Sequence, residues 1–332
     1  MFILEETMIR MLGAIACAAL LASPLETSAA PLPLEMLTDV PLSGKSTRFD
    51  YASLDSGNHR LFIAHLGDSA VIAFDTGRNR VVADIPGIDH VHGVLVVPEL
   101  GRVYASATFR NEIAVIDERS LKVVKRIPGG VYPDGMAYAP HQKKLYVSDE
   151  HGRTETVIDT RTNRRISTLS LNSEVGNSQY DPSSGHVFVN AQTAGKLIEI
   201  DPDTDRIVAS HPLPGCSGPH GLLIDPSDRT AFVACQDNHR LLALDLETMK
   251  VAASSGIGED PDVLTIDPGR RRLYVAAESG IVSVFDLSKG MKKIGEGKIG
   301  DDAHVVAVDP ATHRVYFPLK DVGGIPVLRI MK

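Results

Sequence analysis

The chain repeats itself with a period of 42 residues, and one position in each repeat is almost always Asp or His. The spacing is 42 residues throughout, except for a step of 44 residues between Gly176 and His220. The residues at this position, which we call the ring residues, are Asp50, His92, Asp134, Gly176, His220, Asp262 and His304. A period of roughly 20 to 50 residues marks a repeat architecture, in which each unit buries its apolar surface against its neighbours.

Each repeat contains four short segments that are typical of β-strands. In the third repeat these segments are residues 134–139, 144–149, 154–158 and 165–171. The second segment is the most regular, with an aromatic residue between aliphatic ones, as in Leu145-Tyr146-Val147. Four short strands in a repeat of about 40–45 residues are typical of a propeller blade. The sequence therefore predicts an all-β, seven-bladed β-propeller, and the absence of Trp excludes the Trp-Asp type of blade.

The two ends of the repeated region predict how the ring closes. The seventh repeat reaches the last residue, Lys332, with only three of its four strand segments. Residues 34–42 precede the first repeat and alternate like a strand. We expect this N-terminal strand to complete the seventh blade, because closure removes sheet edges that would otherwise recruit other chains.

The first residues are typical of a secretory signal rather than of the fold. Residues 12–22 form an apolar run that follows Arg10 and precedes the small residues Ser28, Ala29 and Ala30. The run is too short to span a bilayer. We therefore expect a signal peptide at residues 1–29, a single propeller domain at residues 30–332, and a periplasmic or secreted protein.

The net charge and the aromatic content of the chain disfavour several classes of binding partner. The net charge is −8 at pH 7, which disfavours binding to nucleic acids and to anionic membranes. Aromatic residues make up only 5% of the chain, which disfavours broad stacking surfaces for bases or sugars. We expect a monomer without a membrane span that binds a small molecule or a protein.

Two of the three cysteines, Cys216 and Cys235, lie in the propeller region. Antiparallel pairing of the first two strands of blade five places Cys235 opposite His220, with Cys216 four residues upstream. An oxidising compartment favours a disulfide between them. Two free thiols, or a thiolate near His220, are the alternatives.

Ten aspartates have a structural interpretation, because they lie at the turns that follow strands. An Asp side chain caps such a turn by accepting hydrogen bonds from backbone N–H groups just ahead of it. These residues are Asp75, Asp117, Asp159, Asp181, Asp201, Asp225, Asp245, Asp267, Asp286 and Asp309.

The ring residues call for a different interpretation, because the innermost strands of a propeller line its central channel. Residues from separate blades converge only there or on the loop face at the channel mouth. The predicted ligand-binding residues are Asp50, His92, Asp134, His220, Asp262 and His304, together with Arg110, Tyr132, Glu174 and Asn177. Imidazoles and carboxylates held in a ring can coordinate a divalent cation. The predicted metal ligands are His220, His304, Asp262 and His92. The alternative is a polar channel filled with water.

Several of these motifs resemble those of the YVTN/YncE-like propeller proteins, many of which are exported bacterial proteins. The resemblance covers residues 34–332. The matching segments are Leu145-Tyr146-Val147-Ser148-Asp149, Val115-Ile116-Asp117, Ile127-Pro128-Gly129, Pro133-Asp134-Gly135 and Pro219-His220-Gly221. The resemblance implies a seven-bladed ring outside the cytoplasm, and it implies no shared set of catalytic residues.

Three functions are consistent with these observations. The first is a periplasmic propeller that presents its loop face and channel mouth to a ligand or partner, with a divalent metal as its candidate cofactor. The second is a metal-dependent hydrolase, lactonase or lyase that uses the ring. The third is a redox accessory protein that binds copper through His and Cys235.

Overall fold

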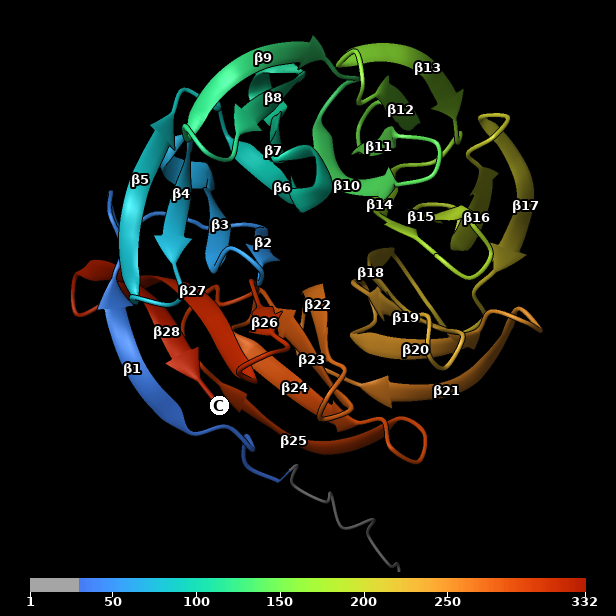
Figure 1. The fold of residues 1–332 in the computed structure, drawn as a ribbon. Coiled ribbons are helices and arrows are strands. Elements are labelled where there is room, and N and C mark those ends of the chain that lie inside the picture. Colours follow the sequence, from blue (N-terminus) through green and yellow to red (C-terminus); the bar gives the residue numbers. More distant parts are fainter. Residues whose placement is uncertain (1–29) are drawn as a thin grey trace, which may run out of the picture.

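The computed structural model describes residues 30–332, which form seven four-stranded antiparallel sheets arranged as blades around a central channel (Figure 1). The seven-bladed β-propeller predicted from the repeat is thereby confirmed. The predicted signal peptide, residues 1–29, lies outside the described residues. Among the residues described, no helix has the length and apolar character needed to cross a membrane.

In blades one to six the strands follow the chain order from the channel to the rim. Blades one to three contain β2 (Ala52–Asp55), β3 (Arg60–His65), β4 (Ala70–Asp75), β5 (Arg80–Pro86); β6 (Val91–Val97), β7 (Arg102–Ala107), β8 (Glu112–Asp117), β9 (Lys122–Pro128); β10 (Pro133–Ala139), β11 (Lys144–Asp149), β12 (Thr154–Asp159) and β13 (Arg164–Ser170). Blades four to six contain β14 (Val175–Tyr180), β15 (Val187–Ala191), β16 (Lys196–Asp201), β17 (Arg206–Pro212); β18 (Pro219–Asp225), β19 (Thr230–Cys235), β20 (Arg240–Asp245), β21 (Lys250–Gly256); β22 (Pro261–Asp267), β23 (Arg272–Ala277), β24 (Ile281–Asp286) and β25 (Lys292–Lys298).

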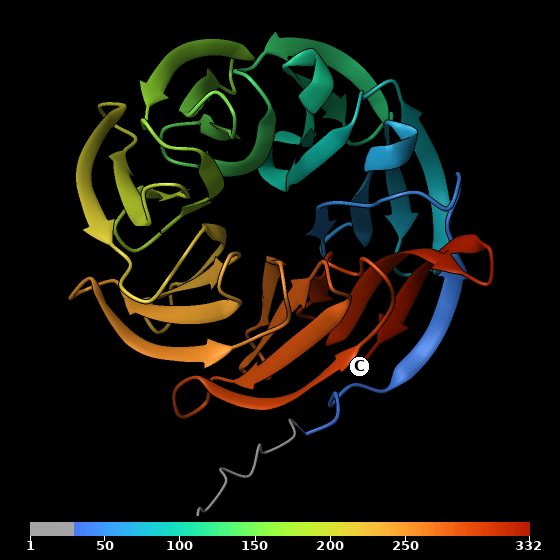
Figure 2. The same cartoon turned by 180° about the vertical axis from the view of Figure 1, so that it is seen from behind.

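The seventh blade combines both ends of the described chain. Its strand order is β26 (Ala307–Asp309), β27 (Arg314–Val322), β28 (Ile325–Met331) and then β1 (Met36–Pro41) (Figure 2). β1 pairs antiparallel with β28, and Arg329 holds Asp39 through two hydrogen bonds of 2.8 and 2.6 Å. The predicted closure by an N-terminal strand is confirmed.

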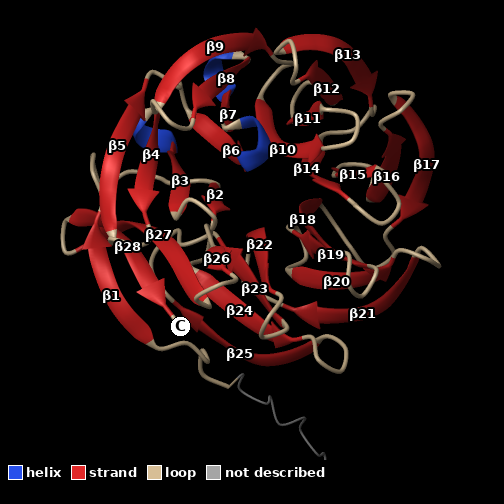
Figure 3. Ribbon diagram, in the orientation of Figure 1, coloured by secondary structure: helices blue, strands red, loops and turns tan. Residues whose placement is uncertain are grey.

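Helical structure among the described residues is limited to three single turns in the first two blades (Figure 3). They are η1 (Leu66–Asp68), η2 (Pro98–Leu100) and η3 (Thr108–Arg110). η1 and η3 lie between the second and third strands of their blades, so they belong to the same face of the ring as the entries to the inner strands.

The second strand of every blade contributes a buried aromatic side chain to the apolar packing between blades. Its aromatic position is occupied by Phe62, Tyr104, Tyr146, Phe188, Phe232, Tyr274 and Tyr316, and each of these side chains is no more than 3% exposed. Burying an aromatic side chain removes about 150–250 Å² of surface from water. The same residue type at one position of each repeat therefore stabilises every blade interface in the same way.

The turn aspartates have the structural role that their positions predict. Asp117 Oδ1 accepts the N–H of Ser120 at 2.8 Å, and Asp225 Oδ1 accepts that of Ser227 at 3.0 Å. The other eight make equivalent bonds to backbone N–H groups. These carboxylates stabilise the fold and take no part in the channel.

One acidic residue, Glu155 in β12, is fully buried between blades three and four without a cationic partner. Ser178 donates a hydrogen bond of 2.6 Å to its Oε1, and Oε2 has no hydrogen-bond partner among the described residues. Burial raises the pKa of this carboxyl well above its ordinary value. The folded state therefore favours the protonated form of this carboxyl.

We expect a chain that begins at Ser43, and so lacks β1, to melt at a markedly lower temperature than a chain that begins at Ala30. The truncation exposes the backbone N–H and C=O groups of β28, which favours association of molecules through that edge. Thermal melts and size-exclusion chromatography of the two chains measure both effects. An unchanged midpoint in a monomeric truncated chain would contradict the role of β1.

We expect Glu155→Gln to stabilise the protein at pH 8 and to have progressively less effect as the pH approaches 5. The folded state favours the protonated carboxyl, so the wild type loses stability as pH rises above the ordinary pKa of 4.5. The neutral amide removes that loss. Denaturant unfolding at several pH values measures it.

Glu199→Gln is the control for this experiment. Burial would raise the pKa of Glu199, but hydrogen bonds from His186 and His211 hold it below its ordinary value. Its replacement should therefore destabilise the protein at neutral pH. A Glu155 variant that behaves in the same way would contradict the assignment of a protonated carboxyl.

Candidate functional site

The ring residues are aimed into the channel by a backbone irregularity that recurs in five blades. His92, Asp134, Gly176, His220 and Asp262 are each the second residue of an inner strand. In each of these strands the pairing register shifts across the ring residue, so that two residues oppose one on the second strand. Such a β-bulge bends the strand and redirects its side chains. Asp50 and His304 occupy the matching places just before β2 and β26.

The glycine that follows several ring residues is required by close contact between blades. A Cβ atom on Gly93 would lie 2.0 Å from the carbonyl oxygen of Asp134, and one on Gly221 would lie 2.1 Å from that of Asp262. No side chain fits at these separations. The Gly in the His-Gly and Asp-Gly pairs is therefore required because the inner strands pack so closely around the channel.

Three ring residues form a buried group with the composition of a metal site. Ligand atoms of Asp50, Asp262 and His304 all lie within 4.8 Å of one another, and all three residues are buried. His220 Nε2 lies 3.4 Å from Asp262 Oδ1, and His92 Nε2 lies 4.0 Å from Asp50 Oδ2. The structure thus places His304 and Asp262 of the predicted metal ligands in the tight group, adds Asp50 to it, and sets His220 and His92 beside it.

The orientation of His304 directs its Nε2 at the carboxylates, 3.9 Å from Asp262 Oδ2. Burial would lower the pKa of this imidazole, but Asp302, Asp262 and Asp50 raise it above its ordinary value. Its Nδ1 lies 3.0 Å from the carbonyl oxygen of Asp302 and 3.1 Å from the Asp302 carboxylate, so Nδ1 carries the hydrogen. Its Nε2 is buried and has no hydrogen-bond partner among residues 30–332. His92 is held in the same way, with Nδ1 2.9 Å from the carbonyl of His90. An imidazole that donates through one nitrogen and offers the other is the usual state of a metal-ligating histidine.

Charges in the channel shift the ionisation of these groups in opposite directions. Burial raises the pKa of Asp50 to about 7 and also raises that of Asp134. Burial would raise the pKa of Asp262 as well, but the hydrogen bond and charge of His220 hold it below its ordinary value. In return, Asp262 overcomes the effect of burial on His220 and raises the pKa of that imidazole to about 9. The three ring aspartates therefore share the channel with three ring histidines and with Arg48, which lies 3.7 Å from Asp50.

Asp50 and Asp262 of this group line a polar cavity of about 160 Å³, together with His92, Asp134 and His220, whereas His304 is buried outside the lining. The other six lining residues are Arg48, Tyr51, Tyr132, Glu150, Gln236 and Glu278. A second cavity of about 300 Å³ lies along the inner strands, and Tyr51 lines both. The Tyr51 hydroxyl reaches across the channel to Asn177 at 2.8 Å and Asp262 at 3.1 Å. Tyr51 therefore divides the channel into two compartments.

The other predicted ligand-binding residues are distributed unevenly around this cavity. Tyr132 lines it and places its hydroxyl 3.1 Å from His92 Nε2, whereas Asn177 contacts it only through Tyr51. Arg110 and Glu174 do not line it. Arg110 lies 3.8 Å from Glu112, and Glu174 lies 3.8 Å from Arg153, with both pairs on the exposed loop face.

Arg48, Tyr51 and Glu150 line the cavity and are not among the predicted ligand-binding residues. Arg48 contacts Glu278 at 2.6 Å, Asp302 at 3.6 Å and Asp50 at 3.7 Å, and so links blades one, six and seven. Arg48 and Tyr51 flank the ring residue Asp50 in the sequence, and this proximity was the available signal. Glu150 directly follows β11 and reaches the cavity only through the way adjacent blades pack.

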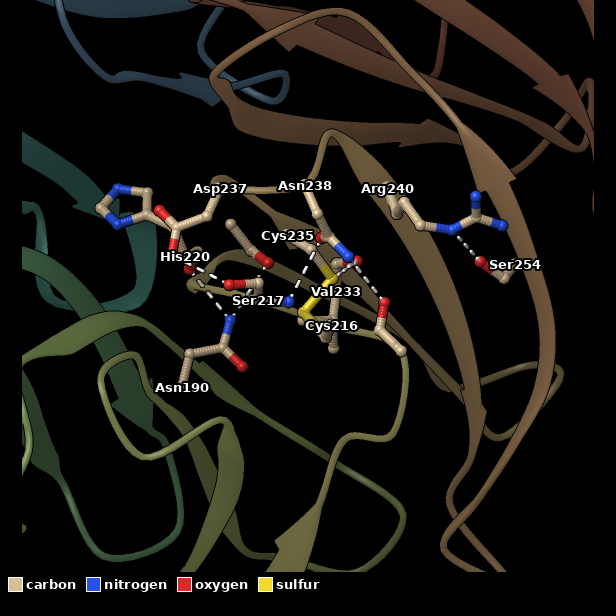
Figure 4. Close-up of a disulfide and its surroundings, with 12 residues drawn as sticks. Asn190, Cys216, Ser217, His220, Val233, Cys235, Asp237, Asn238, Arg240 and Ser254 are labelled. Carbon is tan, nitrogen blue, oxygen red and sulfur yellow. Dashed lines mark hydrogen bonds between the residues drawn. A yellow bond between two sulfur atoms is a disulfide. The ribbon is translucent and has the colours of Figure 1, made fainter.

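The disulfide between Cys216 and Cys235 fixes the loop that precedes His220 (Figure 4). The two Cα atoms are 5.2 Å apart, and the bond joins this loop to the end of β19. Cys235 pairs with Pro219 rather than with His220 as predicted, because the bulge displaces the register by one residue. Asn190 adds two hydrogen bonds to the carbonyls of His220 and Gly221, of 2.9 and 3.1 Å.

The disulfide contradicts the hypothesis of copper bound through Cys235. A metal is bound by the thiolate, and a sulfur in a disulfide has no such charge to offer. Cys235 is also fully buried.

We expect the chain that begins at Ala30 to be two protons lighter before reduction than after it, and to resist alkylation without a reductant. Replacing both cysteines by Ser should cost about 3 kcal/mol of stability, since the bond closes a loop with a sequence separation of 19 residues. Mass spectrometry and denaturant unfolding measure these outcomes. Alkylation of both thiols in the unreduced protein would show that the bridge is not formed.

Comparison with known proteins bears on the fold. No protein-family model matches the sequence, and no curated protein does either. Among solved structures, a chain of the Kuenenia stuttgartiensis hydrazine synthase matches with a TM-score of 0.72 and 16% sequence identity. The match covers 88% of this chain and 96% of that chain. The likeness supports the propeller architecture, and at this identity it extends no further than the fold.

Proposed function

We propose that this protein is an exported, YVTN/YncE-like propeller that binds a divalent transition metal at its channel mouth and a ligand through that metal. One observation carries the proposal. Nε2 of His304 is buried without a hydrogen-bond partner among the described residues, and it shares a 4.8 Å group with the carboxylates of Asp50 and Asp262. An unpaired buried polar atom is costly unless something fills its coordination.

The donor set favours Zn²⁺ among the common cations. Imidazole nitrogen and carboxylate oxygen are ordinary zinc ligands, whereas Ca²⁺ and Mg²⁺ take oxygen ligands almost alone. A dication would also offset the repulsion among Asp50, Asp134 and Asp262, which acts on these groups in addition to burial. His220 and His92 stand close enough to complete the coordination after small movements, because they already contact Asp262 and Asp50.

Export is supported by the disulfide and by the sequence of the first residues. A disulfide persists in the periplasm or outside the cell, whereas the cytosol keeps thiols reduced. The apolar run at residues 12–22 and the small residues after it are typical of a secretory signal.

Metal-dependent hydrolysis or elimination is the second candidate function, and Glu150 favours it. Glu150 lines the same cavity without being one of the ring residues, and burial raises the pKa of its carboxyl. A carboxyl group with a raised pKa beside a metal suits general acid–base catalysis. A bound metal would supply Lewis acidity toward a carbonyl or a water molecule.

We expect the chain that begins at Ala30 to bind one Zn²⁺ and to retain it through desalting. His304→Gln and Asp262→Asn remove proposed ligands and should lower zinc affinity more than about 100-fold. Asp302→Asn keeps the backbone carbonyl that accepts from His304 Nδ1 but removes the carboxylate, which also pairs with Lys320, and it should cost about 10- to 100-fold. Elemental analysis and calorimetric titration measure these values, and melting curves show whether each variant is folded.

His313→Gln is the matched control. His313 also lies beside a carboxylate, 2.8 Å from Asp267, but at a turn far from the ring residues. Its replacement should leave zinc affinity unchanged. A wild-type protein that contains no metal and binds none of Zn²⁺, Cu²⁺, Ca²⁺ and Mg²⁺ would overturn the metal proposal and leave a metal-free binding propeller.

A further inference from the structure

Two aromatic pairs stand at equivalent places in blades two and three, on the loop face beside the polar cavity. His90 stacks on Phe109 with ring centroids 3.7 Å apart, and Tyr132 stacks on His151 at 4.1 Å. His90 and Tyr132 both lie two residues before a ring residue. Phe109 and His151 both lie two residues after the end of the second strand of their blade. The pairs are therefore one structural feature, repeated with the 42-residue period.

The other five blades carry no aromatic residue at these two positions. Their residues are Arg48 with Gly67, Glu174 with Thr193, Gly218 with Asp237, Asp260 with Ser279, and Asp302 with Asp321. The loop face is consequently divided into an aromatic sector over blades two and three and a polar sector over the rest. We call the aromatic sector, made of His90, Phe109, Val131, Tyr132 and His151, the aromatic platform.

The platform is exposed and held in a defined shape. Phe109 is 60% exposed and Val131 is 55% exposed. His90 and Tyr132 adopt left-handed backbone conformations, with φ of 45° and 62°. The equivalent residues of blades five to seven, Gly218, Asp260 and Asp302, adopt the same conformation, so it belongs to the repeated turn before the inner strand. In the platform the N–H of Tyr132 donates to Asn111 Oδ1 at 2.9 Å, and the N–H of His90 donates to Ser69 Oγ at 3.1 Å.

Tyr132 connects the platform with the candidate metal group. Its ring stacks on His151, while its hydroxyl lies 3.1 Å from Nε2 of His92 inside the cavity. The side chain of His92 meets the same tyrosine edge-on, with centroids 5.1 Å apart. A ligand lying on the platform thus has one end at the cavity mouth.

The platform carries charges of both signs: Asp89 lies 3.1 Å from His90, and Glu112 and Glu174 lie beside two arginines. The two arginines and the proposed metal are the cations that an anionic group on such a ligand would meet. Arg110 and Arg153 flank the platform, and their side chains are 59% and 58% exposed. Each is only loosely paired, at 3.8 Å from its nearest carboxylate. A metal bound below Tyr132 would add further positive charge in the cavity.

From this arrangement we infer that the ligand of the channel mouth is a planar aromatic carboxylate, with its ring on the aromatic platform and its carboxylate directed into the cavity. The inference rests on the proposed function for the metal that receives the carboxylate. The platform itself depends only on the described side chains. Stacking against aromatic rings adds to the affinity that burial of apolar area supplies.

The probe is 2-naphthoate, titrated into the zinc-loaded chain that begins at Ala30 and followed by the fluorescence anisotropy of the naphthyl group. Cyclohexanecarboxylate, measured by calorimetry, is the non-aromatic comparison. We expect naphthoate to bind at least about tenfold more tightly. Phe109→Ala and His151→Ala should each weaken naphthoate binding by about three- to tenfold. Val124→Ala, which removes a 54% exposed side chain from β9 on the rim of blade two, should have no effect.

Equal affinities for the two carboxylates, or a Phe109 variant that binds naphthoate like the wild type, would overturn the inference while a zinc-binding wild type kept the metal proposal intact. If the wild type binds no zinc, the proposed function fails and the titration is made on the metal-free protein. Naphthoate binding that depends on Phe109 then supports the platform, and a lack of binding refutes it.

Discussion

The close approach of the inner strands around the channel is the constraint on which the site depends. Carbonyl oxygens of one blade lie where a Cβ of the preceding blade would stand, so Gly93 and Gly221 are fixed by packing alone. The bulge beside each of these glycines turns the preceding side chain toward the channel axis. Because the constraint recurs with the repeat, polar residues far apart in the sequence meet at one depth. The fold thereby builds a site without any local motif.

The close packing of the inner strands also brings buried carboxylates near one another. Asp50, Asp134 and Asp262 share one buried channel, and the histidines between them neutralise part of their charge. Burial penalises each ionised carboxyl, and a like charge nearby adds to that penalty. Arg48, 3.7 Å from Asp50, and the raised pKa of His304 supply part of the countercharge. A bound cation would supply more of it through Nε2 of His304, which has no hydrogen-bond partner among the described residues.

Features that recur with the 42-residue period could be predicted from the sequence. The places of individual loop side chains could not, because they depend on how the blades pack. The blades, the closing strand and the ring residues all follow from one period, so they could be predicted from spacing. Glu150 could not, because its place in the cavity depends on how blade three packs against its neighbours. Arg110 and Glu174 lie outside the polar cavity, and their side chains lie 3.8 Å from Glu112 and Arg153 on the loop face.

Average composition also concealed a local feature. An aromatic content of 5% argued against stacking surfaces, yet Phe109, Tyr132 and two histidines gather on two adjacent blades. A repeat places equivalent residues at equivalent radius and depth, so differences among blades are differences in surface chemistry at fixed positions. A comparison of the residues at one equivalent position in all seven repeats shows which blades carry a surface suited to a ligand. By that criterion, blades two and three differ from the other five at the two positions beside the channel mouth. The aromatic residues therefore lie on one side of the mouth, and a ligand would approach the ring residues from that side.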